Sequence, residues 1–527
     1  METIILRGGL VIDGSGRDGF AADVAVAGGR ICAVGNLEGL RADTVLDCSG
    51  MAITPGFIDI HRHGDGAAFR PGYGTAELCQ GLTTVVNGNC GLSAAPFTPA
   101  HGEEIRRYLI PVTGELPPEL PNETLRQYLD ALPAAPIHQA MLVGGGTLRA
   151  SAAGYELLHL TDSHYAEIHR RMEQALADGA LGVSLGMGYA PECFYTTDEL
   201  IRVLAPLAHT EIPLTVHLRQ EGSGVCDSVG EMLTVAAALR CPLHISHLKA
   251  MGRQNWGNKI PKALEMMEQA RQSGVDVSCD VYPYTAGSTQ LLHILPPDFL
   301  EGGPAQTIGR LRDPAARREL RQRIECGRGF DNIAVLAGWD GIYLTSLHLP
   351  ENRRYQGKSI AQIAEERQCD PLEICCDLLV QEQGQITMID FMASEADIET
   401  ILHSDLSSLI SDATYPTTGL PHPRVYGAFP RLIQRFVQDK KVLTLEQAVQ
   451  KMTSAPAEAL RLSGKGKIAV GMDADLCVFD PVRFHERATY TDPCRTAEGM
   501  HCVLVGGKIA LQEGKPTGVN AGTVLKR

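Results

Sequence analysis

The sequence has little positive charge and few aromatic residues. Its 47 Lys and Arg residues are outnumbered by 62 Asp and Glu residues, which leaves a formal net charge of -15. This surplus of negative charge argues against nucleic acid or an anionic membrane as the main partner. Only 5% of the residues are aromatic, whereas 55 residues are glycine, so many turns are expected.

Targeting and membrane segments are also missing. An apolar run of about 18 residues, which would indicate a membrane-spanning helix, does not occur. The first residues lack the basic and apolar stretches of a signal peptide. The 15 cysteines have no regular spacing, which suits a reducing compartment better than a disulfide framework. We therefore expect a cytoplasmic protein that binds neither membranes nor nucleic acid.

Short apolar segments recur along the middle of the chain, each followed by a helical stretch. This alternation predicts βα units with a parallel sheet. Eight segments are predicted strands: residues 57–63, 83–91, 139–145, 181–189, 213–219, 243–249, 276–284 and 407–414. Eight parallel strands close a (β/α)8 TIM barrel, which is the α/β fold we expect.

The two ends of the chain predict a different structure. Residues 24–31 (VAVAGGRI) and 503–509 (VLVGGKI) each indicate a strand, a Gly-Gly turn and a second strand. We expect residues 1–56 and 456–527 to form one small β-sandwich domain, with residues 57–455 as the catalytic barrel between them. The seventh and eighth strands are separated by about 120 residues, several times a usual connection. This gap predicts an inserted, lid-like subdomain at roughly 287–345.

The strongest local signal is the pair His61 and His63 at the end of the first predicted strand. Residues i and i+2 of a strand point to the same face, roughly 6–7 Å apart. Both imidazoles could therefore bind one metal ion at the mouth of a barrel. Taken alone, the pattern is also explained by two unrelated histidines.

Other metal-binding side chains end further predicted strands. They are Cys90, His217, His247 and Asp412, after the second, fifth, sixth and eighth strands. Catalytic groups of (β/α)8 enzymes lie at the carboxyl ends of different strands, and thiolate and imidazole suit zinc. A buried structural role explains any one of these residues equally well. Together with His61 and His63, these four residues place six possible ligands at the same end of the barrel strands. This arrangement predicts a zinc site.

Several segments resemble the D-aminoacylase (N-acyl-D-amino-acid deacylase) family of the amidohydrolase superfamily. They are residues 81–91 (GLTTVVNGNCG), 93–96 (SAAP), 246–249 (SHLK), 280–289 (DVYPYTAGST) and 422–427 (HPRVYG). The similarity covers most of the chain, and the segment around Cys90 is specific to this branch. Other amidohydrolases, such as dihydroorotase and hydantoinase, bridge two metals with a carboxylated lysine on strand four. Residues 183–189 (VSLGMGY) contain no lysine, and the resemblance implies that Cys90 takes its place.

The resemblance also implies how the metal ligands are divided. A tight zinc site would consist of Cys90, His217 and His247. A second, weaker site would consist of His61, His63 and Asp412, with Cys90 bridging the two. Because D-aminoacylases work with only the tight site filled, the occupancy of the second site is left open.

For the substrate, the resemblance implies that Tyr189 touches the scissile carbonyl. Four further residues would hold the α-carboxylate of the amino acid: Lys249, Tyr282, Ser288 and Arg424. An anionic substrate approaching a protein of net charge -15 needs fixed cations, and each charged hydrogen bond contributes about 1.5–3 kcal/mol. The alternative is that both cations are surface or ion-pair residues and that the tyrosines and the serine only pack. His293 is explained at least as well as an ordinary loop residue.

We therefore expect zinc-dependent hydrolysis of N-acyl-D-amino acids to a carboxylate and a free D-amino acid. Zinc lowers the pKa of bound water to about 7, which supplies hydroxide at neutral pH. Asp412 would accept the proton of the attacking water and deliver it to the leaving amine. The alternatives are a cyclic-amide hydrolase or dipeptidase of the same superfamily, and a catalytically inactive barrel that serves as a scaffold. The expected partner is a small anionic N-acyl amino acid, and the oligomeric state is left open.

Overall fold

Eight short parallel strands form the centre of the computed structural model, which describes residues 3–156, 159–327 and 329–527. In chain order they are β6 (Phe57–Asp59), β7 (Leu82–Asn87), β8 (His138–Met141) continued by β9 (Val143–Gly144), β10 (Val183–Gly186), β11 (Leu214–His217), β12 (Leu243–Ile245), β13 (Val277–Val281) and β17 (Ser407–Leu409). Nearly all residues of these strands are buried, as expected for a parallel sheet covered on both faces. Each of the eight predicted segments therefore contains a strand.

The strands close into a barrel. Hydrogen bonds join them in two runs, β9-β10-β11-β12-β13-β17 and β6-β7-β8. β8 and β9 are one strand interrupted at Leu142, whose amide donates to the Asn87 carbonyl at 2.9 Å. The remaining gap closes after β17. There Asp412 N donates to the His61 carbonyl at 3.0 Å, and His63 N donates to the Ala413 carbonyl at 2.9 Å. The predicted (β/α)8 barrel is confirmed.

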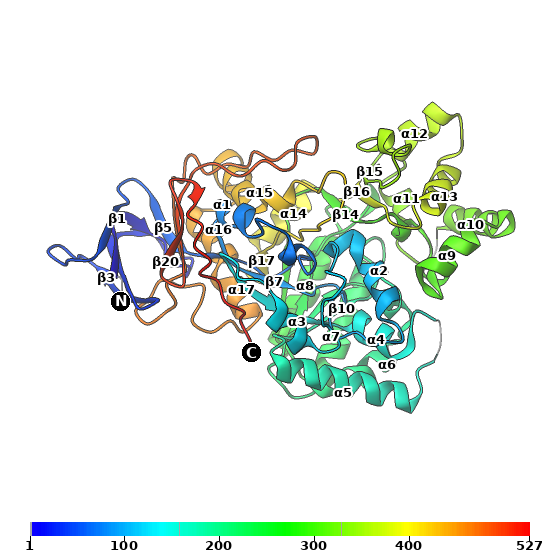
Figure 1. Cartoon of the computed structure of the whole chain (residues 1–527), viewed down its shortest axis with the longest axis horizontal. Coiled ribbons are helices and arrows are strands. Elements are labelled where there is room, and N and C mark those ends of the chain that lie inside the picture. Colours follow the sequence, from blue (N-terminus) through cyan, green and yellow to red (C-terminus); the bar gives the residue numbers. More distant parts are fainter. Residues whose placement is uncertain (1–2, 157–158, 328) are drawn as a thin grey trace.

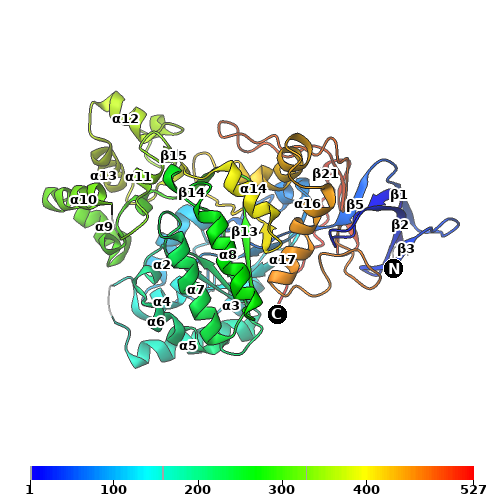
Figure 2. The ribbon, with the colours of Figure 1, turned by 180° about the vertical axis from the view of Figure 1, so that it is seen from behind.

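Helices cover the outside of the barrel (Figures 1 and 2). Local signals at α5 (Asp162–Asp178) show why they form. Thr161 caps its first turn by accepting from His164 N at 3.4 Å, and Gly179 ends it with a φ of 119°. The other outer helices are α1 (Thr75–Cys79), α2 (Gly102–Thr113), α3 (Leu125–Ala131), α4 (Gly145–Ala153), α6 (Thr197–Val203), α7 (Val225–Leu239), α8 (Lys259–Gln272), α14 (Glu395–His403), α15 (Arg424–Arg431), α16 (Leu445–Met452) and α17 (Ser454–Ala459).

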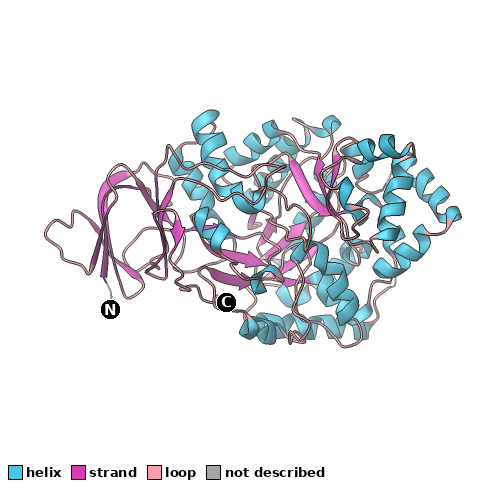
Figure 3. Cartoon of the chain, turned by 45° about the horizontal axis from the view of Figure 1, so that its top comes forward, coloured by secondary structure: helices cyan, strands magenta, loops and turns pink. Residues whose placement is uncertain are grey.

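Both ends of the chain join in one nine-stranded sheet beside the barrel (Figures 1 and 3). Its strands are β1 (Thr3–Val11), β2 (Phe20–Ala27), β3 (Arg30–Gly35), β4 (Thr44–Asp47), β5 (Ala52–Pro55), β18 (Leu476–Phe479), β19 (Met500–Val505), β20 (Lys508–Gln512) and β21 (Lys515–Pro516). The two halves meet where β5 pairs antiparallel with β18, with Ile53 opposite Val478. Residues from both halves share a small apolar core, which includes Val24, Leu476 and Leu504. The sheet therefore folds over this core as a small sandwich.

A buried ion pair links this sheet to the barrel. Asp475, just before β18, accepts from Lys465 Nζ at 2.5 Å and lies 3.0 Å from Nε2 of His138 in β8. Removing one partner of a buried charged network costs about 3–5 kcal/mol. We expect Asp475→Ala to lower the free energy of unfolding by that amount in urea denaturation. Asp492→Ala, which removes an exposed pair with Arg495, should have little effect. Equal losses in the two variants would contradict this account.

Besides α14, the described part of the segment between β13 and β17 contains a small antiparallel sheet and five further α-helices. The sheet has the order β14-β16-β15, with strands Ala286–Gln290, Thr387–Phe391 and Ile342–Ser346. The helices are α9 (Gly303–Leu311), α10 (Pro314–Cys326), α11 (Ile333–Leu336), α12 (Ile360–Arg367) and α13 (Pro371–Gln381). They project away from the barrel on the side opposite the terminal sheet (Figure 2). The domain limits at 56, 455 and roughly 287–345 stay predictions.

No helix in the described part of the chain is both long and apolar enough to cross a membrane.

Candidate active site

The six predicted metal-binding residues lie together at the carboxyl ends of the barrel strands. His61 and His63 follow β6, and Cys90 follows β7. His217 is the last residue of β11, His247 follows β12, and Asp412 follows β17. Parallel strands of a closed barrel end on one rim, which is why residues up to 351 positions apart become neighbours. All six side chains are at least 88% buried.

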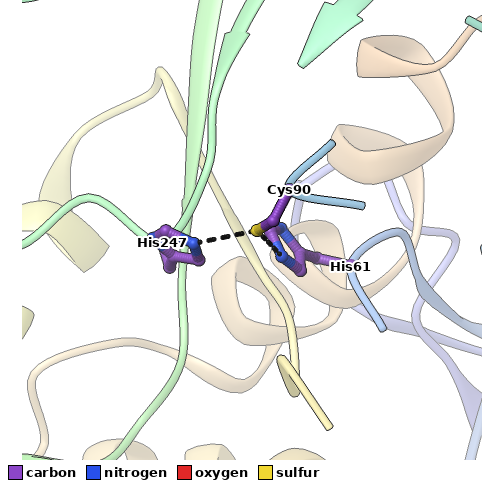
Figure 4. A group of neighbouring side chains, drawn as sticks. All are labelled: His61, Cys90 and His247. Atoms are coloured by element: carbon purple, nitrogen blue, oxygen red, sulfur yellow. Dashed lines mark hydrogen bonds between the residues drawn. The ribbon is translucent and has the colours of Figure 1, made fainter. Parts of the chain in front are cut away.

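Cys90 is at the centre of this group. Its Sγ lies 3.2 Å from His61 Nε2 and 3.4 Å from His247 Nε2, and Figure 4 shows the two imidazoles directed at the sulfur. His217 Nδ1 lies 3.1 Å from the same Nε2 of His247. One thiol and three imidazoles from four different strands therefore face one point of the barrel mouth.

Asp412 extends the group on the side of β6. Its Oδ1 lies 3.2 Å from His63 Nε2 and 3.5 Å from His61 Nε2. The ligand atoms of His61, Cys90 and His247 lie within 4.8 Å of one another, and so do those of His61, His63 and Asp412. Zinc in proteins is bound by thiolate, imidazole and carboxylate. The donor set and its spacing therefore fit one zinc ion at Cys90 and leave room for a second beside Asp412.

Three of these residues adopt backbone angles that L-amino acids rarely take. The φ angles of Cys90, His247 and Asp412 are 53°, 35° and 51°. Such conformations cost about 1–3 kcal/mol each and persist only where the surrounding structure holds them. Asp280 accepts from His247 N, and the His61 carbonyl accepts from Asp412 N at 3.0 Å. Left-handed turns at the strand ends direct these three side chains to one place.

The charges in the group favour metal binding. Burial acts to raise the pKa of the Cys90 thiol, but the neighbouring imidazoles of His61 and His247 hold it well below its ordinary value. Burial likewise opposes ionisation of Asp412, and the Arg424 guanidinium, 3.0 Å away, holds the pKa of that carboxyl well below its usual range. Thiolate and carboxylate are the forms that bind metal cations.

Two buried carboxylates that the sequence did not single out support the histidines. Glu221 Oε1 lies 3.0 Å from His247 Nδ1. Asp280 lies 3.6 Å from His61 Nδ1, and it is itself 2.8 Å from His244 Nε2. Carboxylates commonly hold metal-ligating imidazoles by their second nitrogen. The signals available were weak: Glu221 comes four residues after His217, and Asp280 is the penultimate residue of the buried strand β13.

A cavity of about 420 Å³ opens beside this group. Of the residues predicted to contact the substrate, Tyr189, Lys249, Tyr282 and Ser288 line it. The Tyr189 ring lies 4.4 Å from the His217 ring and 4.1 Å from the His293 ring, measured between centroids. His293 therefore lies on the cavity wall, where burial lowers its pKa to about 3 and keeps it neutral.

Arg424 lies behind the cavity wall. Its side chain is fully buried, with the guanidinium 4.9 Å from the centre of the Tyr282 ring and Nη2 donating to the Ser288 carbonyl at 3.2 Å. Arg62, between the two histidines that follow β6, points away from the group and pairs with Glu77 at 2.6 Å. The structure thus brings Lys249 to the cavity surface and places both arginines in the interior.

Comparisons with known proteins agree with this geometry. A model of the amidohydrolase family matches residues 360–511. A D-aminoacylase of Alcaligenes xylosoxydans xylosoxydans is 36% identical over 99% of this chain and 97% of its own length. An N-acyl-D-glutamate deacylase of the same organism is 32% identical over 99% and 96%. A similar fold is found in the crystal structure of an N-acyl-D-glutamate deacylase from Bordetella bronchiseptica, which contains zinc and a phosphonate mimic of the tetrahedral intermediate. The two structures superpose with a TM-score of 0.84 at 30% sequence identity, and the superposition covers both chains fully. The chain therefore belongs to the D-aminoacylase family of amidohydrolases.

Proposed function

We propose that this protein hydrolyses the amide bond of N-acyl-D-amino acids, releasing a carboxylate and a free D-amino acid, with zinc as its cofactor. The observation that carries the proposal is the convergence of Cys90, His217 and His247 on the buried wall of the cavity, with Asp412 on the same wall. Relatives named for this reaction match nearly the whole chain. The substrate is a small anion, in agreement with the lysine on the cavity surface.

The proposed ligands of the first zinc ion are Cys90, His217 and His247. His61, His63 and Asp412 would hold a second ion, with Cys90 shared between them. Zinc held by these residues would lower the pKa of a bound water and would polarise the scissile carbonyl. The crowding of two histidines around one Asp412 oxygen, at 3.2 and 3.5 Å, supports the second site.

Asp412 is the proposed general base and then general acid. Its carboxylate lines the cavity and is ionised, so it can accept the proton of an attacking water. An amine is a poor leaving group as an anion and must receive a proton as the amide bond breaks. The same carboxyl group can return the proton to that nitrogen, while Arg424 pairs with the Asp412 carboxylate at 3.0 Å and His63 contacts it at 3.2 Å.

Lys249 is the proposed main contact of the substrate's α-carboxylate, because it lines the cavity next to His247. Tyr282 and Ser288 line the same wall and would add hydrogen bonds. Arg424 is the second proposed cation; its charge acts from behind the Tyr282 ring, at longer range than that of Lys249. Tyr189 would contact the scissile carbonyl from its place beside His217.

Replacing Lys249 should affect binding more than chemistry. One charged hydrogen bond contributes about 1.5–3 kcal/mol, which corresponds to about 10–100-fold in affinity. We expect Lys249→Met to raise KM for N-acetyl-D-methionine by that factor, with a smaller change in kcat. Lys451→Met, which removes a buried lysine on the opposite side of the barrel, should leave KM unchanged. An unchanged KM in Lys249→Met would remove Lys249 from carboxylate binding.

A substrate panel on zinc-loaded protein tests the proposed reaction. We expect hydrolysis of N-acetyl-D-amino acids and much slower hydrolysis of their L-enantiomers. Preferred hydrolysis of hydantoin, dihydroorotate or a dipeptide would instead identify a cyclic-amide hydrolase or a dipeptidase. A protein that binds no metal and hydrolyses none of these compounds would be a scaffold.

The cytoplasm is the proposed location of the enzyme. The ground is its 15 cysteines, all of which are free thiols in the structure. Fractionation of cells that express the tagged protein tests this proposal, and recovery from the extracytoplasmic fraction would contradict it.

A further inference from the structure

Glu221 contacts both the candidate metal centre and the candidate substrate cation. Its side chain is buried, with Oε1 3.0 Å from His247 Nδ1 and accepting from Lys249 Nζ at 2.6 Å. The backbone that carries this side chain is held in place, because the amides of Glu221 and Gly222 both donate to the Asp331 carboxylate. One carboxylate oxygen therefore joins a zinc-binding imidazole to the lysine of the cavity.

The two ring nitrogens of His247 have different surroundings. Nε2 faces Cys90 Sγ at 3.4 Å and His217 Nδ1 at 3.1 Å, so this nitrogen points at the proposed zinc position. A nitrogen that binds a metal must offer its lone pair. Neutral imidazole carries one proton, and this proton must therefore be on Nδ1 for His247 to act as a ligand.

Lys249 and Glu221 act on Nδ1 in opposite directions. Lys249 Nζ lies 2.8 Å from Nδ1, and an ammonium group can only donate, so it stabilises the tautomer in which Nδ1 is bare. An ionised carboxylate can only accept, so Glu221 stabilises the tautomer in which Nδ1 carries the proton. Without Glu221, the neighbouring lysine would favour the form of His247 that cannot bind zinc through Nε2.

We propose that Glu221 is a positioning residue that selects the metal-binding tautomer of His247 against the competing lysine. The inference rests on the proposed function, because it takes His247 as a zinc ligand and Lys249 as the cation for the substrate's carboxylate. A carboxylate bound at Lys249 attracts the ammonium group and relieves its competition for Nδ1. Zinc and substrate then strengthen each other's binding, since coupling between two ligands is reciprocal.

The test measures the zinc affinity of the metal-free full chain by competition with a chelating dye. Loss of a carboxylate that holds a ligand histidine typically weakens metal binding about 10–100-fold, and we expect this loss for Glu221→Gln. Glu221→Asp, which keeps a carboxylate, should retain part of the zinc affinity that Glu221→Gln loses. Lys249→Met should bind zinc at least as tightly as the unchanged protein. The double variant Glu221→Gln with Lys249→Met should bind zinc more tightly than Glu221→Gln alone, because the competing donor is gone.

Asp475→Asn is the matched control, because Asp475 also contacts a histidine and a lysine in the interior but lies far from the cavity. It should lose stability and keep its zinc affinity. Equal zinc affinities of Glu221→Gln and Asp475→Asn would overturn the inference. So would a loss in Glu221→Gln that Lys249→Met does not reduce, since Glu221 would then act as a direct ligand. If Glu221→Gln does not fold, Glu221→Asp with and without Lys249→Met gives the same comparison.

These zinc measurements need no turnover. If the unchanged protein hydrolyses no N-acetyl-D-amino acid but the zinc affinities follow the expected pattern, the proposed reaction fails and the role of Glu221 at His247 stands. If N-acetyl-D-amino acids are hydrolysed and Glu221→Gln retains full zinc affinity, the reaction stands and this inference fails.

Discussion

Asp412→Asn is expected to lower kcat for N-acetyl-D-methionine by at least about 100-fold and up to about 10⁴-fold, the range of general acid–base catalysis. The amide has nearly the shape of the carboxyl group but cannot accept the proton of an attacking water. Zinc at the first site should remain, because Cys90, His217 and His247 are unchanged. The measurement is kcat at saturating substrate, together with the zinc content of the same preparation.

Asp397→Asn is the control for Asp412→Asn. Asp397 is also a buried carboxyl, 3% exposed, but it lies outside the cavity and accepts from Gly257 N at 2.9 Å. We expect its variant to keep kcat within about twofold, as for a change without contact to the reacting atoms. If Asp412→Asn keeps more than a tenth of kcat with full zinc content, Asp412 is not the proton carrier.

The barrel could be predicted from the sequence because each strand carries its own signal. Parallel strands are buried on both faces, so they are short apolar runs, and turn residues such as Gly179 mark the ends of the helices between them. That both ends of the chain form one small β domain could be predicted from the repeated Gly-Gly hairpins near them, but its nine strands could not. The segment after β13 could be predicted only as an insertion, because its antiparallel strands pair across about 100 residues and no local pattern fixes that pairing.

The clustering of the proposed metal ligands could be predicted for a related reason. His217 ends an apolar strand, Cys90 and His247 come within three residues after one, and a barrel places all strand ends on one rim. Glu221 and Asp280 carry no such signal, because carboxylates are common near strand ends. These two residues matter because Glu221 points at His247 and Asp280 points at His61. The direction of the Glu221 side chain depends on the loop after β11, and that of Asp280 depends on its position in β13.

The position of Arg424 shows another limit of the sequence. Its place in the His-Pro-Arg segment gives no information on whether the guanidinium reaches the cavity. The structure places it 3.0 Å from Asp412, on the side away from the cavity, where it holds that carboxylate in its charged form. A cation near a proposed catalytic carboxylate can therefore either stabilise the charge of that carboxylate or bind the carboxylate of the substrate. Only the three-dimensional contacts distinguish these two roles.

Cys90→Ser should remove zinc and activity together. Its thiolate is the proposed ligand shared by both zinc positions, and a serine hydroxyl stays protonated near neutral pH and binds zinc poorly. Loss of a residue that only supports a ligand weakens metal binding about 10–100-fold, so loss of the ligand itself should weaken it by more than about 100-fold. In cobalt-loaded protein, the near-ultraviolet absorption from the thiolate should disappear, a readout that is independent of turnover.

Cys279→Ser is the matched control for this variant. Cys279 lies in β13, fully buried in the same barrel, and burial raises the pKa of its thiol so that it stays protonated and unable to bind metal. Its variant should keep the zinc affinity and the cobalt spectrum of the unchanged protein. Because both substitutions replace a buried sulfur by oxygen, their difference isolates the metal bond from the cost of burying a hydroxyl. A Cys90→Ser protein that binds zinc as tightly as Cys279→Ser would show that the metal is held without the thiolate.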